Sequence, residues 1–404
     1  MDGDIWDKYY RLKQNPFVVK AVEKGGIVPL TTFYGRTLQI KKLKSHIETN
    51  ERSLTLIVGD PGVGKTSFVN VVRQKDLTEY FTPRKEIDCQ RDFDSSKFMI
   101  NILDTIYETL DQMENKEKYQ TVYDFIKRTG HFNNESGKQL SLQSHSYLKA
   151  LLEKITKKVK ESGFKGIILH FNNLENFVID DDTKFKNFLM GIRDVLLLDN
   201  CHFVFVGNRE ASDCFNANQK VKTIVTDLMK LPPLSENDIK TIVKKRLEVF
   251  RIGDVKYLEP VTEDTIEFLY KLHSGNIREI LTALDYAVKN ADKIKSLGKQ
   301  INESMTKTIL KKVVEEDSKE LTPRTYEVLK YMIKKGNATN SEITKELEIH
   351  AQNTSTYIKE LLEAGFIGLE KKTGKMKIYV PKNKSLWYTI EPDKGPQYSL
   401  NSFG

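Results

Sequence analysis

The chain has 404 residues, of which 39% are hydrophobic and 30% charged, and its formal net charge at pH 7 is +8. This length exceeds what one hydrophobic core serves and predicts two or three domains of ordinary globular composition. No run of eighteen apolar residues occurs, which argues against a membrane-spanning helix, and residues 1–6 lack the pattern of a secretory leader. We therefore expect a cytoplasmic protein without membrane contact, whose basic charge permits a polyanionic partner.

The first strong motif follows an apolar strand at residues 54–58. Residues 59–66 are Gly-Asp-Pro-Gly-Val-Gly-Lys-Thr and fit the pattern G-x-x-x-x-G-K-[ST] at every fixed position. Glycines there let backbone N–H groups turn toward phosphates, while Lys65 reaches the β- and γ-phosphates and Thr66 can bind Mg²⁺. The motif predicts a site for ATP or ADP with Mg²⁺. The candidate nucleotide-binding residues in it are Gly59, Pro61, Gly62, Val63, Gly64, Lys65, Thr66 and Ser67.

Short apolar strands and longer helical stretches alternate after this motif, which is typical of a parallel α/β sheet. The pattern predicts helices, strands and one loop, in this order: helix 67–74, strand 85–89, helix 95–113, loop 133–143, helix 147–162, strand 166–171, helix 183–198 and strand 202–206. These are the parts of a P-loop domain in P-loop order. We therefore expect the carboxyl ends of the strands to form the nucleotide site.

Amides follow the buried strand at 166–171, where a P-loop ATPase carries an Asp for Mg²⁺ and a Glu for the attacking water. The chain has Asn172 and Asn173 at these positions. An amide can bind a metal-bound water, but it has no charge and cannot accept a proton. Slow or absent hydrolysis is therefore expected, although Glu175 could replace the missing carboxylate.

The next strand ends at Asn208, which could contact a γ-phosphate or simply favour the turn after Gly207. Residues 231–234 then break the chain, and Ser235 with Asp238 forms a capping box that starts a helical region up to about residue 312. Within this region, Arg278 occupies the first turn of a helix, against the preference of the helix dipole. A phosphate would account for a cation at that position.

With these motifs in this order, the chain resembles the AAA+ ATPases, in particular the branch that holds the replication initiators of the origin-recognition group and the related STAND signalling ATPases. Asn15-Pro16-Phe17 and Phe33-Tyr34-Gly35-Arg36 resemble the adenine-side box of that family. The resemblance implies that Gly35 and Arg36 lie near adenine, that Asn208 is sensor 1 and that Arg278 closes onto the γ-phosphate. Residues 218–223, where the family often has an arginine finger, contain only lysines as cations. Hydrolysis activated by a neighbouring subunit is therefore not expected, because lysine lacks the bidentate fork of arginine.

The C-terminal part has a separate pattern of three helices and a hairpin. Thr322-Pro323 starts a helix to about Lys335, a capping box at residues 339–342 starts a second, and a third covers residues 352–364. Strands at 365–369 and 376–380 flank a basic tip, and Leu361, Leu362, Phe366 and Ile367 are expected in the core. This arrangement resembles a winged helix, which binds double-stranded DNA with its third helix and its wing. The candidate DNA contacts are Gln352, Asn353, Thr354, Ser355, Thr356 and Lys359 in the helix and Lys371, Lys372 and Lys375 in the hairpin.

The predicted architecture is therefore an α/β P-loop AAA+ domain at residues 1–230, an α-helical lid at 231–318 and a winged helix with a C-terminal tail at 319–404. Three hypotheses follow. The favoured one is an ATP-gated switch that binds duplex DNA, and the second is an active DNA-dependent ATPase or loader that depends on Glu175. The third is a STAND-type signalling or scaffold protein whose winged helix docks protein, in a homo-oligomer or with another partner.

Overall fold

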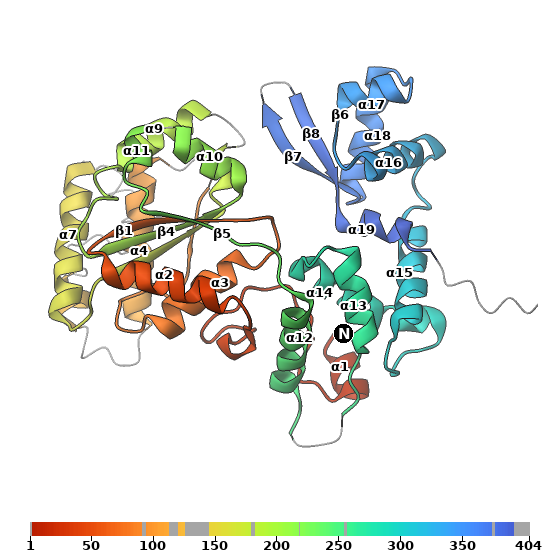
Figure 1. Ribbon diagram of the computed structural model, residues 1–404, viewed down its shortest axis with the longest axis horizontal. Helices are drawn as coiled ribbons and strands as arrows, with labels where there is room; N and C mark the ends of the chain where they lie inside the picture. The colour runs from red at the N-terminus through yellow and green to blue at the C-terminus, as the bar shows by residue number, and fades with distance from the viewer. Residues whose placement is uncertain are drawn as a thin grey trace, which may run out of the picture. The chain divides into compact units, whose positions relative to one another are not determined.

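The computed structural model describes residues 2–90, 94–112, 120–125, 145–178, 182–217, 219–253, 257–373 and 376–391 (Figure 1). The chain divides into two compact units. The α/β unit is Lys20–Leu234, and the second unit combines Met1–Val19 with Ser235–Gly404. None of the helices in the described part of the chain is long and apolar enough to cross a membrane. The three-domain division proposed from the sequence stays a prediction.

The α/β unit alternates strands and helices as the sequence pattern predicts. Its strands are β1 (Ser53–Val58), β2 (Ile87–Asp88), β3 (Ile167–Asn172), β4 (Cys201–Gly207) and β5 (Asp227–Lys230). Its helices are η1 (Leu30–Thr32), α2 (Thr37–Thr49), α3 (Lys65–Val71), η2 (Val72–Asp76), α4 (Ser95–Asp111), α7 (His145–Glu161), α8 (Glu175–Val178), α9 (Asp182–Ile192), α10 (Arg209–Ala217) and α11 (Gln219–Lys222). All strand pairs are parallel, in the order β2-β3-β4-β1-β5.

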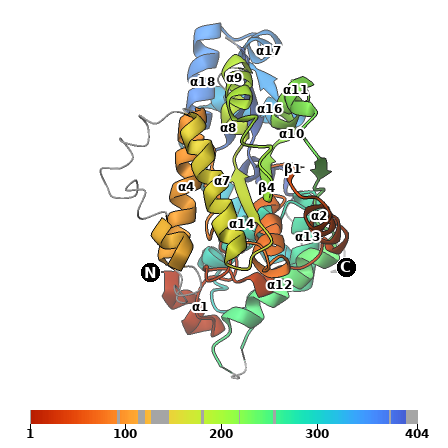
Figure 2. The ribbon, with the colours of Figure 1, turned by 90° about the vertical axis from the view of Figure 1, so that its left-hand side faces the viewer.

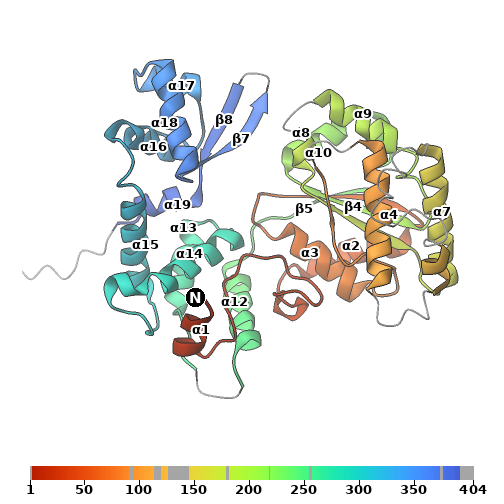
Figure 3. The same ribbon diagram turned by 180° about the vertical axis from the view of Figure 1, so that it is seen from behind.

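Two apolar clusters cover the two faces of this sheet, as expected for parallel strands that are buried on both sides. On the face we call the α3 face, after the helix labelled in Figure 1, Phe68 and Val69 of α3 pack with alternate residues of β1, β3 and β4. On the opposite face, the α4 face, residues of α4, α7 and α9 form the larger cluster. Figure 2 and Figure 3 show α4 and α7 side by side on that face, and α4 packs against α7 in the structure.

Aromatic rings form the centre of the α4 face. Phe98 of α4 stacks on Phe171 of β3 with ring centroids 4.7 Å apart, and Phe171 stacks on Phe205 of β4 at the same distance. All three side chains are fully buried. Because Phe171 directly precedes Asn172, this stack fixes the end of β3 where the candidate site begins.

The predicted elements of the α/β unit are confirmed in type and order, with two corrections at their ends. The helix expected at 183–198 ends at Ile192, and turns connect it to β4. The helix after the P-loop begins at Lys65 and changes at Val72 to a π-turn that ends at Asp76. The loop expected at 133–143 lies outside the described residues.

The second unit contains one helix from the N-terminal segment and several helices that follow the α/β unit in the sequence. These are α1 (Asp2–Tyr10), α12 (Glu236–Phe250), α13 (Glu263–Leu272), α14 (Ile277–Lys289), η3 (Ala291–Ile294) and α15 (Glu303–Asp317). The buried Arg246 of α12 donates hydrogen bonds to the carbonyls of Pro16 and Val18, and Tyr10 of α1 donates to the carbonyl of Lys299. The capping box of Ser235 and Asp238 is present as predicted.

A winged helix completes the second unit. It contains α16 (Pro323–Lys335), β6 (Ala338–Thr339), α17 (Asn340–Glu346), α18 (Ala351–Glu363), β7 (Ile367–Thr373) and β8 (Met376–Pro381), followed by α19 (Asn383–Leu386) and η4 (Trp387–Thr389). The strands form an antiparallel sheet in the order β6-β8-β7. The three helices and the hairpin are confirmed. The buried Trp387 packs against Tyr286 of α14, so the described start of the tail belongs to the core of this unit.

Candidate functional site

The P-loop connects β1 to α3 through two glycines in the left-handed region, with φ of 87° at Gly62 and 90° at Gly64. A side chain at Gly59 has no space, because its Cβ would lie 2.6 Å from the carbonyl oxygen of Leu231. No side chain caps the start of α3. The positive end of the α3 dipole is therefore directed at the loop, as the motif predicts.

Lys65 and Thr66 carry the side-chain groups of this loop that are predicted to bind phosphate and Mg²⁺. The Lys65 Nζ donates to the carbonyls of Gly59 at 2.7 Å and Asp60 at 3.0 Å, so the ammonium group lies over the loop. The Thr66 hydroxyl donates to Oδ1 of Asn172 at 3.1 Å. The structure therefore brings the P-loop and the end of β3 together at the carboxyl edge of the sheet.

Two other candidate residues support the loop from its own unit. Arg36 is largely buried, and its guanidinium donates to the carbonyls of Val63 at 2.7 Å and Pro232 at 2.9 Å. Gly35 and Arg36 both have positive φ, of 83° and 61°, which turns the chain before α2. The Ser67 hydroxyl accepts a hydrogen bond from the N–H of Val22. Arg36 thus holds the P-loop backbone, while its predicted place near adenine stays a prediction.

The sequence interpretation missed one acidic residue near the end of β3. Asp88 ends β2 and is paired in register with Asn172. Its Oδ1 accepts a hydrogen bond of 2.8 Å from the side-chain amide of Asn173. The sequence could have predicted this position of Asp88, because the residue lies within the strand predicted at 85–89 and parallel strands end at the same edge of a sheet.

Glu175, the acidic residue that the sequence favoured, lies on the other face of the sheet. A Cβ at Gly207 would point to the α4 face, as Phe203 and Phe205 do, and it would lie 3.4 Å from Oε2 of Glu175. This oxygen is buried and has no hydrogen-bond partner in the described residues. Burial raises the pKa of the Cys89 thiol on the same face, and the charges of Asp88 and Glu175 raise it further.

Asn208 and Arg278 complete the candidate nucleotide residues. The Asn208 side chain accepts a hydrogen bond from the N–H of Ala211 at 3.0 Å, so its oxygen caps the start of α10. This contact agrees with the second alternative from the sequence, in which Asn208 favours the turn after Gly207. Arg278 is exposed in the first turn of α14, in the second unit. Its approach to a phosphate stays a prediction.

Most candidate DNA contacts on α18 face solvent. Gln352, Asn353, Ser355, Thr356 and Lys359 are exposed. Thr354 is a correction to the predicted set, since it is fully buried and its hydroxyl accepts from Thr344 of α17. Its role is to join the two helices.

Two further residues of α18 differ from expectation. Leu362 was expected in the core, but 37% of it is exposed. Glu360 accepts a hydrogen bond from the Thr325 hydroxyl of α16, so its charge is directed toward the neighbouring helix. The exposed positions 352, 353, 355, 356 and 359 therefore form a surface with polar groups and one lysine.

The wing contributes the basic part of this candidate interface. Lys371 and Lys372 lie in β7, and Lys375 lies outside the described residues. The register pairs Lys372 with Lys377 of β8.

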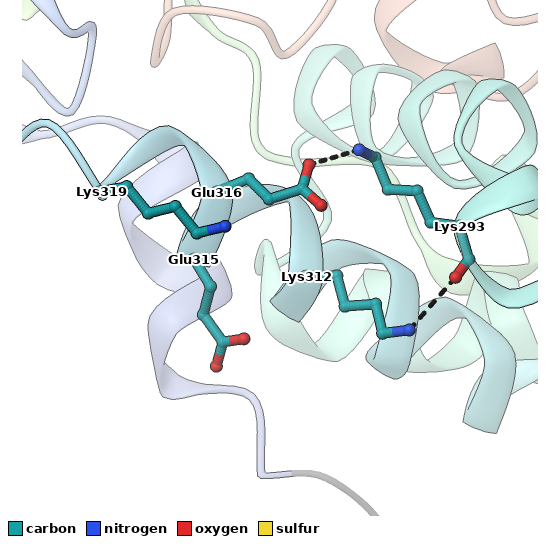
Figure 4. A pocket seen from close by; sticks show the side chains of 5 residues that line it. All are labelled: Lys293, Lys312, Glu315, Glu316 and Lys319. Atoms are coloured by element: carbon teal, nitrogen blue, oxygen red, sulfur yellow. Dashed lines mark hydrogen bonds and ion pairs between the residues drawn. The ribbon is translucent and has the colours of Figure 1, made fainter.

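A separate pocket in the second unit is lined by charged residues of η3, α15 and the turn after it (Figure 4). Glu316 forms an ion pair with Lys293, and Lys312 donates to the carbonyl of Lys293 at 3.1 Å. The hydrogen bond from Lys293 lowers the pKa of Glu316. Because these groups already bind each other, we assign no ligand to this pocket.

Comparisons with known proteins agree with this geometry. Residues 32–175 match the family profile described as AAA ATPase domain, and residues 321–367 match the one described as winged helix-turn-helix DNA-binding. The chain thus carries an AAA ATPase domain and a C-terminal winged helix. The resemblance to AAA+ ATPases and the fold class inferred from the sequence are confirmed.

Individual relatives are distant. An uncharacterized HTH-type transcriptional regulator of Methanocaldococcus jannaschii is 22% identical over 391 residues, which cover 90% of this chain and 89% of that protein. The structure of a Walker-type ATPase of Pyrococcus abyssi is similar with a TM-score of 0.51 at 14% identity, covering 93% of this chain and 99% of that one. The ORC2 protein of Aeropyrum pernix has a TM-score of 0.49 at 11% identity, covering 93% and 96%.

Proposed function

We propose that this protein is an ATP-dependent switch that binds duplex DNA through its winged helix and hydrolyses ATP slowly or not at all. The observation that carries this proposal is the contact between Thr66 and Asn172. The hydroxyl that would bind Mg²⁺ faces an amide, at a position where P-loop ATPases place a carboxylate. The site is therefore built to hold a nucleotide but lacks a charge at this position.

The residues of the P-loop fit ATP or ADP with Mg²⁺. The backbone of residues 59–66 would hold the phosphates, while Thr66 and Asn172 offer oxygen atoms to the metal or its water. Lys65 has to leave the carbonyls of Gly59 and Asp60 to reach a phosphate. Nucleotide binding would therefore move the Lys65 side chain away from the loop carbonyls, a change that distinguishes the bound from the free state.

Several groups that could accelerate hydrolysis are neutral or engaged. Asn172 and Asn173 carry no charge, and the oxygen of Asn208 caps α10. The segment at 218–223 offers lysines instead of an arginine. We expect ATP to act mainly as a conformational ligand, with the products ADP and phosphate forming rarely.

Support for DNA as the partner comes from the winged helix. The exposed side chains of α18 include amides, hydroxyls and a lysine, which are groups that bind base edges and phosphates. The wing adds Lys371, Lys372 and Lys375. The matching family is described as DNA-binding, and the relative from Methanocaldococcus is described as a transcriptional regulator.

The test is binding of labelled duplex DNA across a salt series, without nucleotide, with ADP and with ATP, while phosphate release is followed in the same samples. The proposal expects DNA binding that depends on nucleotide and weakens with salt. The variant with Lys371, Lys372 and Lys375 changed to Glu should bind more weakly, and its log-log salt slope should decrease by about 0.9 for each DNA phosphate that the variant no longer neutralises.

A matched control carries the same charge change elsewhere. Lys154, Lys157 and Lys160 are exposed on α7 of the α/β unit, and changing them to Glu should leave the salt slope as in the wild type. An equal loss of affinity in both variants would show that total charge matters and not the wing. Absence of DNA binding at low salt in every nucleotide state would reject the DNA part of the proposal.

One observation favours a second candidate, a signalling or scaffold ATPase whose winged helix docks protein. Three apolar side chains of the winged helix are exposed, namely Leu362 of α18, Leu369 of β7 and Met376 of β8, with exposed fractions of 37%, 42% and 51%. Exposed apolar groups are typical of protein-binding surfaces. The same DNA titration separates the two candidates, and self-association of the protein is measured alongside it.

A further inference from the structure

Asp88 is a carboxylate beside the P-loop site that none of the sequence motifs includes. It is exposed at the end of β2, in the strand that neighbours β3. Its register partner is Asn172, and its Oδ1 is 2.8 Å from the side-chain nitrogen of Asn173. Asn173 has a φ of 58°, which turns the chain sharply after β3 and sets its amide against Asp88.

The alternation of side chains places Asp88 on the face of the P-loop helix. Ile87 and Cys89 both belong to the apolar cluster of the α4 face. Since successive residues of a strand point to opposite faces, Asp88 belongs to the α3 face, together with its register partner Asn172. Asn172 in turn accepts the hydrogen bond of Thr66. The three groups lie on one face, at one edge of the sheet.

Glu175 is separated from this site by the same alternation. It lies against Gly207, which follows Phe203 and Phe205 on the α4 face. Its carboxylate is therefore across the sheet from Thr66. Of the two carboxylates at the carboxyl ends of β2 and β3, Asp88 and Glu175, Asp88 is the one that shares the face of the P-loop helix.

We infer that Asp88 is the carboxylate that activates water in this site, and that Asn173 holds it in position. This inference rests on the proposed binding of ATP at the P-loop. The water oxygen forms a bond to the γ-phosphorus, and the bond from that phosphorus to the bridging oxygen breaks with its electron pair leaving on ADP. The proton of the water passes to the Asp88 carboxylate and then to solvent. In a P-loop ATPase the carboxylate that activates water follows the strand equivalent to β3. Here an amide follows β3, and the carboxylate ends the neighbouring strand β2.

Hydrolysis through Asp88 remains slow, because Asn172 adds no charge to the site. The inference is therefore compatible with a switch that holds ATP for a long time. It narrows the expectation from slow or absent hydrolysis to a low rate of hydrolysis that depends on Asp88. General bases contribute on the order of 100- to 10,000-fold to a rate, so removal of Asp88 should be clearly measurable.

The experiment measures two properties of each full-length variant, the affinity for a fluorescent ATP analogue and the rate of phosphate release with Mg²⁺. Asp88→Asn should bind the analogue within about threefold of the wild type and release phosphate at least about 100-fold more slowly, near the rate of Lys65→Ala. Asp88→Asn combined with Asn173→Asp restores the contact with carboxylate and amide exchanged. This double variant should regain release to within about tenfold of the wild type, a recovery that a purely structural role for Asp88 would not produce.

Glu51→Gln is the matched control, because Glu51 is an exposed carboxylate before β1, at the opposite edge of the same sheet. It should release phosphate as the wild type does. Undiminished release in Asp88→Asn would overturn the inference, as would wild-type release no faster than Lys65→Ala, or a loss seen only in Glu175→Gln. These results leave the proposed nucleotide switch intact as long as the analogue binds. Failure of the wild type to bind it rejects the proposed function, and the inference with it.

Discussion

Changing Asn172 to Asp tests the electrostatics of the candidate site in two opposite directions. In the structure Asn172 accepts a hydrogen bond of 3.1 Å from Thr66, and its register partner is Asp88. The change adds a negative charge beside the hydroxyl that would bind Mg²⁺. It also places two carboxylates at directly opposed positions of β2 and β3. In the free protein the stronger hydrogen bond from Thr66 therefore opposes this repulsion, and in the complex we expect Mg²⁺ with ATP to bind more tightly.

The magnitudes follow from these contacts. A hydrogen bond to a neutral acceptor contributes about 1 kcal/mol and one to a charged acceptor about 1.5–3 kcal/mol. For a metal-bound water that donates to residue 172 in the ATP complex, this difference of about 0.5–2 kcal/mol corresponds to roughly 2- to 30-fold in the affinity for Mg²⁺. Without ligand, the like charges of Asp88 and the new Asp cost about 0.2–1 kcal/mol. For a unit that spans residues 20–234, this cost lowers the melting temperature by at most about 4 °C.

The assay is a thermal melt of the wild type and Asn172→Asp without ligand, followed by titration of Mg²⁺ at fixed ATP analogue. Asn172→Ala serves as the control that removes the acceptor without adding charge. Combining Asn172→Asp with Asp88→Asn should recover the wild-type melting temperature, since one of the two charges is gone. A melt and an Mg²⁺ titration that are both unchanged in Asn172→Asp would refute the placement of Asn172 beside Asp88 and Thr66.

Three further variants test other parts of the structure. Gly59→Ala places a Cβ 2.6 Å from the carbonyl oxygen of Leu231, so the loop has to shift. We expect a loss of about 1–3 kcal/mol in the free energy of unfolding and weaker nucleotide binding. An unchanged Kd for the ATP analogue would contradict this expectation. Burial lowers the pKa of His202 to about 4. The unfolded chain, with a His pKa near 6.5, binds the extra proton between these values, so the stabilisation is present at pH 7 and is lost as pH falls toward 4, by up to about 3 kcal/mol. His202→Phe should therefore show a shallower decline of melting temperature between pH 7 and 5, and parallel curves for both proteins would argue against a neutral buried imidazole. Thr339→Ala removes the cap of α17, where Thr339 and Glu342 form a capping box. Urea unfolding should show a loss of about 1 kcal/mol in the free energy of unfolding. An unchanged free energy of unfolding would mean that solvent replaces the cap.

The sequence predicted those features that depend on local patterns. The P-loop, the alternation of strands and helices and the three helices of the winged helix each leave a periodic or motif signal within a few residues. The boundaries of β1, β3 and β4 were predicted to within one or two residues, because buried parallel strands are continuous apolar runs. The capping boxes at Ser235 and Thr339 located two helix starts, because a capping box is a motif of four consecutive residues.

The features that were missed depend on tertiary pairing. The role of Asp88 follows from the position of β2 beside β3, and β2 is only two residues long. The face on which Glu175 lies is decided by the turn at Asn173, where φ is 58° in a residue other than glycine. The burial of Thr354 was within reach, because positions 354, 358 and 361 form the buried stripe of α18 at helical spacing.

The early residues of the chain complete their packing only with residues that are made much later. Trp6, Tyr10 and Phe17 are fully buried, and the N–H of Lys13 donates to the carbonyl of Phe250. At about 5–20 residues per second, a ribosome needs on the order of 10–50 s to reach that partner. During this time the α/β unit can fold, while Trp6, Tyr10 and Phe17 have only one another to pack against. Residues 1–19 therefore depend on the second unit for their packing, although they precede the α/β unit in the sequence.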